Sequence, residues 1–296
     1  MKRFISIIGV ILLIIICDVL AGIFGRYYTT HLTDYSFFCA QVCNVMLNKE
    51  ADIVIIGASK ANHSYITDSF ATDNLSAFNA GIDGTDCYAA YMSLVALSSR
   101  KVPKIVIFDI ADRQLEKKPE KTAKTFAFLY GSSDAFGELL SRELSSIEKI
   151  KLRSHLYRYN KFPETIVSML HDKNKTAGGY VPLEGEYDGD FSENHLFDCN
   201  EKEVFYLSEM VDFCKRNEIE LILSVSPACV NNVSFNEWLE NYCKDSGVIL
   251  FNNNKLYWDR HDLFHDDMHL NHEGALLFTK VIFDNIRGGV NNYGIE

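Results

Sequence analysis

The stretch that decides the fold is Asp52-Ile53-Val54-Ile55-Ile56-Gly57-Ala58-Ser59, a short run of β-branched residues that ends in Gly-Ala-Ser. An uninterrupted apolar run of this length is typical of a strand that is buried on both faces of a parallel sheet. Open α/β sheets place their chemistry at the carboxyl ends of such strands. The run therefore predicts that the Ser59 hydroxyl lies at the carboxyl edge of a buried sheet, although a cap for the following helix is the simpler role for a serine there.

Further short apolar runs alternate along the chain with segments of helical periodicity. This alternation is typical of a parallel sheet covered by helices on both faces, which is a three-layer α/β/α fold. The runs predict a central parallel sheet of about five strands. The expected strands centre on Ile53, Ser76, Ile105, Leu221 and Ile249, and the expected helices cover 64–70, 85–99, 134–151, 202–217, 235–245 and 271–286.

The second informative stretch is Asp266-Asp267-Met268-His269-Leu270-Asn271, directly ahead of the last expected helix. A serine hydroxyl is a weak nucleophile at neutral pH. It needs an imidazole to accept its proton and a carboxylate to hold that imidazole in the correct tautomer. The stretch predicts that His269 is the base for Ser59 and that Asp266 orients it, with Asp267 as the alternative carboxylate.

A third stretch, Asn79-Ala80-Gly81-Ile82-Asp83-Gly84, follows the second expected strand. A nucleophile turn, a glycine turn and a late Asp-x-x-His, in this order, resemble the sequence blocks of the SGNH (GDSL-like) hydrolase superfamily. The resemblance covers residues 52–286 and implies a flavodoxin-like α/β/α fold and an ester hydrolase. It implies that Ser59 is the nucleophile, that the N–H groups of Ser59 and Gly84 form the oxyanion hole, and that the late Asp-x-x-His supplies the base and its partner.

One block of the superfamily is not matched. Where the superfamily offers an asparagine side chain after its third strand, this chain has Ile110-Ala111-Asp112-Arg113. An ionised aspartate only accepts hydrogen bonds, so Asp112 can donate to an oxyanion only if it holds a proton, whereas Arg113 can donate. Loss of one oxyanion donor typically costs on the order of 3 kcal/mol of barrier. The departure therefore affects the expected rate and substrate class more than the expected fold.

The amino-terminal residues form an export signal. Lys2-Arg3 precedes an apolar run that continues past a single acidic residue, Asp18, to Arg26. An apolar helix of about 20 residues can span a bilayer, and the flanking positive charges keep the amino terminus inside. We expect a signal anchor over 1–26 that places the rest of the chain on the outer side of the cell membrane. A cleaved signal peptide that ends before Gly22 is the alternative.

Beyond the anchor, the sequence indicates one domain on a stalk. We expect a helical stalk over 27–50 and a hydrolase domain over 51–290, in which the glycine- and charge-rich stretch 171–199 is an insertion of loops. Loops at the carboxyl edge of a parallel sheet shape the choice of substrate. Partial burial is usual for scattered tyrosines, but a sugar-stacking wall is an alternative role for five residues near this insertion. They are Tyr157, Arg158, Tyr159, Tyr180 and Tyr187.

Histidines near the end of the chain offer a rival interpretation. On a helix, their spacing would place imidazoles and carboxylates on one face as ligands for a metal ion. The residues are His261, His265, His269 and His272, with Asp262, Asp266 and Asp267. The segment before Asn271 has loop character, which favours the serine interpretation. For His63, four residues after Ser59, we favour a position at the surface over one that lines the pocket.

The composition excludes several classes of protein. The chain of 296 residues has a formal net charge of -11, and no basic patch stands out that would bind nucleic acid. It has no nucleotide-binding glycine loop, so no cofactor is expected. Its eight cysteines show no forced pairing, which leaves free buried thiols or one or two disulfides open.

These features predict a membrane-anchored, extracytoplasmic serine esterase. Its partner would be an acylated carbohydrate or another ester, with O-acetyl groups on an envelope or secreted polysaccharide as the preferred substrate. One alternative is an O-acyltransferase that uses the same three residues and receives its acyl group from a membrane acyltransferase partner. The other is a catalytically silent glycan-binding or assembly protein.

Overall fold

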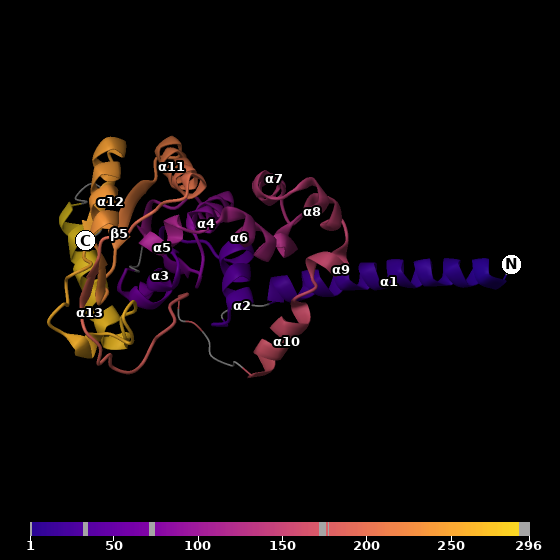
Figure 1. Cartoon of the computed structure of the whole chain (residues 1–296), viewed down its shortest axis with the longest axis horizontal. Coiled ribbons are helices and arrows are strands. Elements are labelled where there is room, and N and C mark those ends of the chain that lie inside the picture. Colours follow the sequence, from indigo (N-terminus) through magenta and orange to yellow (C-terminus); the bar gives the residue numbers. More distant parts are fainter. Residues whose placement is uncertain (1, 32–34, 71–74, 172–175, 177, 290–296) are drawn as a thin grey trace.

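A parallel sheet of five strands forms the centre of the computed structural model, which describes residues 2–31, 35–70, 75–171, 176 and 178–289 (Figure 1). The strand order is β2-β1-β3-β5-β7, and every neighbouring pair is parallel. The predicted α/β fold with a parallel sheet is therefore confirmed. In this order, the strands are β2 (Ala77–Gly81), β1 (Ile53–Gly57), β3 (Ile105–Asp109), β5 (Glu220–Val225) and β7 (Ile249–Asn252).

Helices cover both faces of the sheet. Successive residues of a strand point to opposite faces, so each strand contributes side chains to both helical layers. Val54 and Ile56 of β1 face one layer of helices, and Ile53 and Ile55 face the other. All four are buried, and burial of one such side chain stabilises the fold by roughly 1.5–3 kcal/mol. The first layer contains α4 (Cys87–Arg100), α11 (Glu201–Arg216) and α12 (Val233–Ser246), and the second contains α3 (Ser59–Ser64) and α13 (His272–Gly289).

The remaining elements surround this core. In Figure 1, α7 to α10 gather around the end of α1 that meets the domain, and α6 lies between them and the sheet. The helices are α1 (Lys2–His31), α2 (Phe38–Cys43), α5 (Asp112–Leu115), α6 (Pro119–Thr125), α7 (Asp134–Glu143), α8 (Ser146–Lys151), α9 (His155–Arg158) and α10 (Phe162–His171). Short helical turns are η1 (Asn44–Asn48), η2 (Thr67–Ser69), η3 (Ala127–Leu129) and η4 (His261–Leu263), and a second parallel pair is formed by β4 (Ser192–Asn194) and β6 (Val230–Asn232).

Helix α3 differs from its prediction. A helix was expected over 64–70, but α3 begins at Ser59 and ends at Ser64. The Asn79 side chain explains the early end, because its Nδ2 donates to the carbonyl oxygens of Ala61 at 2.8 Å and Tyr65 at 3.0 Å. These carbonyls are satisfied without a further helical turn.

The helix predicted over 134–151 is divided into α7 and α8. Ser145 starts the second helix with a capping box, in which its Oγ accepts from the Glu148 N–H and the Glu148 carboxylate accepts from the Ser145 N–H. Two backbone groups are thereby satisfied at a new helix start. The Ser-x-x-Glu pattern at this point is readable in the sequence.

The segment 27–50 was expected to form a helical stalk. Its helical parts, α2 and η1, pack against the core through buried residues that include Val42, Val45 and Met46. Before them, α1 has the length and apolar character to cross a membrane over Ser6–His31. Figure 1 shows α1 projecting from the folded domain toward the N-terminus.

The predicted loop insertion at 171–199 contains little regular structure in its described part. Residues 176 and 178–199 include one short strand, β4. All eight cysteines lie in the described part of the chain, and all are free thiols. The interpretation as free thiols therefore describes this structure.

Candidate active site

The turn after β1 presents Ser59 at the carboxyl edge of the sheet. Gly57 ends β1 with a φ of 153°, and a Cβ atom there would lie 2.6 Å from the Asp109 carbonyl oxygen of β3. The close approach requires glycine. The chain then enters α3 at Ser59, whose N–H has no intrahelical acceptor because it belongs to the first helical turn.

The loop before α13 brings a histidine to this serine. His269 Nε2 lies 2.7 Å from Ser59 Oγ, although 210 positions separate the two residues in the chain. His269 Nδ1 lies 2.9 Å and 3.0 Å from the two carboxylate oxygens of Asp266. A carboxylate accepts hydrogen bonds, so Nδ1 carries a proton and Nε2 is available to accept one from the hydroxyl. The structure thus brings together the three residues singled out from the sequence.

Asp266 is held as an anion. Burial would raise the pKa of Asp266, but hydrogen bonds from the His269 ring and the Met268 N–H lower this pKa to about 2. The Met268 and His269 N–H groups donate to Asp266 Oδ1 at 2.8 Å and 2.9 Å. Asp266, and not the alternative Asp267, is therefore the carboxylate that contacts the His269 ring.

The turn that contains Gly84 is fixed on both sides. The Ile82 N–H donates to the Gly57 carbonyl oxygen at 3.0 Å, which ties the turn to the end of β1. Lys117 Nζ donates to the carbonyl oxygens of Gly84 at 2.6 Å and Thr85 at 3.0 Å. Gly84 has a φ of 70°, a conformation that favours glycine. Lys117 carried no sequence signal, because a lysine in a polar segment has no distinctive pattern.

Asp112 is excluded as an oxyanion donor by its own contacts. Its Oδ2 accepts from Asn232 Nδ2 at 2.8 Å, and its Oδ1 accepts from the Arg113 N–H at 2.7 Å. Both carboxylate oxygens therefore act as acceptors. The Arg113 side chain is exposed and lines a cavity together with Asp112 and Lys60, so of the two candidates it is Arg113 that can still donate.

His63 lies inside the site and not at the surface, which corrects the favoured prediction. It is 7% exposed, and its ring centroid lies 5.6 Å from that of His269. Its Nδ1 donates to the Val181 carbonyl oxygen at 2.7 Å, and its Nε2 lies 3.5 Å from Asp83 Oδ1. Burial lowers the pKa of His63, but the hydrogen bond and charge of Asp83 outweigh it and raise this pKa. The spacing from Ser59 was the available signal, since one helical turn places both on one face.

A buried lysine follows the nucleophile directly. Lys60 is 5% exposed, and its Nζ donates to the Ser226 carbonyl oxygen at 2.8 Å. Asp109, at the end of β3, is fully buried. Burial lowers the pKa of Lys60 and raises the pKa of Asp109, and the two opposite charges act against both shifts. The sequence did not reveal this pair, because Lys60 follows β1 and Asp109 ends β3, and no local pattern connects the two.

A small polar cavity lies at the carboxyl edge of the sheet. It has a volume of about 130 Å³ and is lined by Lys60 and Met268, the chain neighbours of Ser59 and His269. Further lining residues follow the ends of β3, β5 and β7, where open α/β sheets bind their ligands. Its polar lining residues include Asp112, Arg113, Glu116, Asn194, Asn232 and Asn254.

The clustered histidines have different partners. The His261 ring packs on Phe191, His265 Nδ1 donates to the Glu184 carbonyl oxygen, and His272 Nδ1 lies 3.0 Å from the Tyr180 hydroxyl. His269 faces Ser59. Within the described ranges, no three His, Cys, Asp or Glu side chains converge as metal ligands.

The proposed tyrosine wall is not formed. Tyr180 is buried against His272, whereas Tyr157 and Tyr159 lie at α9 beside α1. These residues belong to separate parts of the molecule. Partial burial, which is usual for scattered tyrosines, therefore describes these residues better than a sugar-stacking wall.

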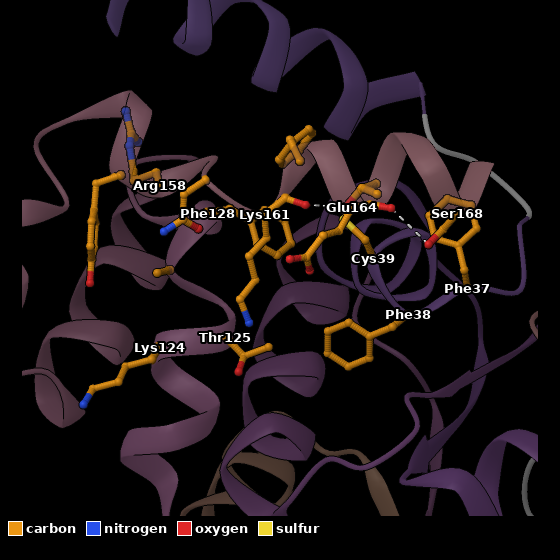
Figure 2. Close-up of a pocket in the computed structure, with 15 residues that line it drawn as sticks. Phe37, Phe38, Cys39, Lys124, Thr125, Phe128, Arg158, Lys161, Glu164 and Ser168 are labelled. Carbon is orange, nitrogen blue, oxygen red and sulfur yellow. Dashed lines mark hydrogen bonds between the residues drawn. The ribbon is translucent and has the colours of Figure 1, made fainter. Parts of the chain in front are cut away.

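A larger cavity lies away from Ser59. It has a volume of about 430 Å³, and Figure 2 shows Phe37, Phe38 and Phe128 around it together with Arg158 and Lys161. None of its lining residues belongs to α3 or to the loop before α13. The cavity is therefore separate from the candidate active site.

The fold and this site define an α/β protein with a Ser-His-Asp constellation at the carboxyl edge of its sheet. No family model and no curated protein matches the chain. Similar solved structures include a candidate lipolytic protein of the G-D-S-L family from Desulfitobacterium hafniense, with 15% identity, coverage of 80% of this chain and 99% of that chain, and a TM-score of 0.42. A candidate acylhydrolase from Bacteroides fragilis has 13% identity, coverage of 90% and 95%, and a TM-score of 0.44. A GDSL-like lipase from Bacteroides thetaiotaomicron has 14% identity, coverage of 81% and 89%, and a TM-score of 0.42.

Proposed function

We propose that this chain is a serine ester hydrolase of the SGNH type. The observation that carries the proposal is the 2.7 Å contact between Ser59 Oγ and His269 Nε2, with the Asp266 carboxylate on the other ring nitrogen. A hydroxyl bonded to an oriented neutral imidazole is an activated nucleophile. The intact contact supports an enzyme over a catalytically silent binding protein.

The reaction follows from these contacts. Ser59 Oγ attacks the acyl carbonyl carbon while its proton passes to His269 Nε2, and the N–H groups of Ser59 and Gly84 receive the oxyanion. His269 then gives the proton to the leaving alcohol as the ester bond breaks. Water, activated by the same ring, attacks the acyl-enzyme and releases the acid and the free serine.

The substrate we propose is a short acyl ester on a polar alcohol, with O-acetyl groups on an envelope or secreted polysaccharide as the leading case. The polar lining and the volume of about 130 Å³ of the cavity at the carboxyl edge of the sheet support a small polar group over a long acyl chain. The apolar helix α1 supports a signal anchor with the domain outside the cell membrane.

A fluorophosphonate probe tests the proposal, because it reacts with activated serines. We expect the label on Ser59 in the full chain, and we expect Ser59→Ala to lose both the label and the hydrolysis of a small acetyl ester while its thermal unfolding stays unchanged. Ser93→Ala, a buried serine of α4, is the matched control and should keep both. An unlabelled Ser59 in a folded chain would favour a binding protein. Consumption of the ester that requires a glycan acceptor, and that yields acetylated glycan in place of free acetate, would favour the acyltransferase alternative.

A further inference from the structure

Helix α1 is fastened to the folded domain well before its end. Asp18 accepts hydrogen bonds from Ser154 Oγ at 2.6 Å and from the Leu156 N–H at 3.0 Å, and it pairs with His155 Nδ1 at 3.0 Å. An acidic residue in an apolar helix is costly in a membrane unless it is paired in this way. The three contacts fix the position of α9 along α1.

Two glycines allow α9 to lie directly against α1. A Cβ atom at Gly22 would lie 2.6 Å from the His155 ring, and one at Gly25 would lie 2.5 Å from the Tyr159 ring. Small residues permit this close approach of helices. The domain is therefore held on the side of α1 and does not hang from its end.

The part of α1 before Asp18 is too short to cross a bilayer alone. Residues 6–17 are exposed along their whole length, and the domain holds α1 at Asp18. From Lys2 to Cys17 the helix has 16 residues, or about 24 Å. The hydrocarbon core is about 30 Å thick and needs about 20 residues. Residues beyond Asp18 must then enter the membrane interface, and α9 must enter with them.

The domain surface next to α9 has the composition that this position requires. Ile147 and Ile150 of α8 are 67% and 64% exposed and lie on one face of the helix, at positions i and i+3. Exposed Lys151 and Arg153 follow them, and Leu156 of α9 is also exposed. Exposed aliphatic and basic side chains together suit the boundary between acyl chains and anionic headgroups. Figure 1 shows α8 and α9 at the edge of the domain that faces along α1 toward the N-terminus.

We propose that α8 and α9 form a membrane-seating surface that lies in the outer interface of the bilayer. The inference rests on the proposed membrane anchor. The occupant of this surface is lipid, with the aliphatic side chains of α8 at the level of the upper acyl chains and the basic side chains among anionic headgroups. The domain consequently sits on the bilayer and is not displayed at a distance from it.

Depth-dependent quenching tests this position in the full chain. Ile147→Trp and Ile150→Trp are compared with Leu276→Trp, an exposed position on α13, in vesicles of phosphatidylcholine and phosphatidylglycerol with brominated acyl chains. The native Trp238 and Trp258 give the same background in every variant. We expect the added emission at 147 and 150 to be quenched at least about twofold more than that at 276, because bromine atoms lie below the headgroups.

Each outcome bears on the proposal. Equal quenching at the three positions, with the protein still floating with the vesicles, would leave the anchor in place and overturn the seating surface. Failure to float, or an amino terminus that begins near Gly22, would overturn both the anchor and the surface. Hydrolysis of a soluble acetyl ester is measured on the same samples. Failure of the esterase proposal is thereby distinguished from failure of the membrane-seating surface.

Discussion

The rings of His63 and His269 meet edge to face, with centroids 5.6 Å apart and planes at 88°. Each ring has its own carboxylate, Asp83 for His63 and Asp266 for His269. Two histidine–carboxylate pairs thus lie side by side at α3. The ring of His269 contacts Ser59 Oγ, so we expect His269 to act as the base and His63 to position the site.

The first prediction separates these roles. His269→Ala should lower kcat for a small acetyl ester by about 10²- to 10⁴-fold, because the serine loses its proton acceptor. His63→Gln should retain activity within about tenfold, because this side chain positions the site and accepts no proton from Ser59. Steady-state kinetics at neutral pH measures both variants, with unfolding curves as the control for folding. Comparable losses in the two variants would contradict the assignment of His269 as the base.

The second prediction concerns the stability of the His63–Asp83 pair. Burial would lower the pKa of His63 and raise that of Asp83, but their mutual contact reverses both shifts. A raised histidine pKa stabilises the fold below the unfolded value of about 6.5, and this stability is lost as the pH rises through the folded value. A lowered aspartate pKa stabilises the fold above about 3.9 and is lost as the pH falls through the folded value. Both contributions operate between about pH 4 and 6.5.

Thermal unfolding of wild type and Asp83→Asn across pH measures this window. The difference in Tm should be largest near pH 5 and should shrink by pH 9, because the stabilisation from the raised pKa of His63 is lost as the pH rises. Asp68→Asn, an aspartate of the exposed turn η2, is the control and should show no such window. A Tm difference that is constant over this range would refute the charged pair.

The geometry around Ser59 was predictable because its signals are local. The apolar run of β1 fixes a buried strand, and the turn at Gly57 exposes the next serine whatever surrounds it. The Asp266-x-x-His269 pattern is also local, since backbone N–H groups of the same loop hold the carboxylate. The residues of each segment therefore determine its own conformation.

The parts that were missed depend on distant partners. His63 was predicted at the surface and Lys60 was not singled out, because their partners Val181 and Ser226 are connected to α3 by no local pattern. The contact of Asp18 in α1 was not predictable for the same reason, since its partner Ser154 lies 136 positions further along the chain. Hydrophobic periodicity defines an apolar face, and it does not define what covers that face.

The third prediction concerns the buried charges behind the nucleophile. Lys60→Met should destabilise the fold by about 3–5 kcal/mol, because it leaves the buried Asp109 charge without its counter-charge. The double variant with Asp109→Asn should lose less than the sum of the two single losses, because it removes both charges. Urea unfolding of the four proteins measures the coupling. Strictly additive losses would show that Lys60 and Asp109 do not act on one another.

The fourth prediction tests the residue that replaces the missing asparagine donor. Arg113→Ala should lower kcat by at least about tenfold but by less than the 10²- to 10³-fold typical of a buried oxyanion donor, because the side chain is exposed. KM should change little, and Arg113→Lys should recover part of the loss. Arg216→Ala, an exposed arginine at the end of α11, serves as the control. An unchanged kcat in Arg113→Ala would remove this side chain from the oxyanion hole.

The last prediction uses two glycines with the same backbone conformation. Gly84 has a φ of 70° and Gly247 a φ of 71°, and no atom lies within 4 Å of a Cβ built at either position. Alanine at each should therefore destabilise the fold by a similar amount, about 1–2 kcal/mol, through backbone strain alone. The effects on activity should differ, because relaxation of the strain at 84 turns the oxyanion N–H away from the acyl group, whereas Gly247 ends α12 far from Ser59 in the chain. Equal unfolding losses with a fall in kcat for Gly84→Ala alone would support the proposed donor, and full activity in both variants would exclude it.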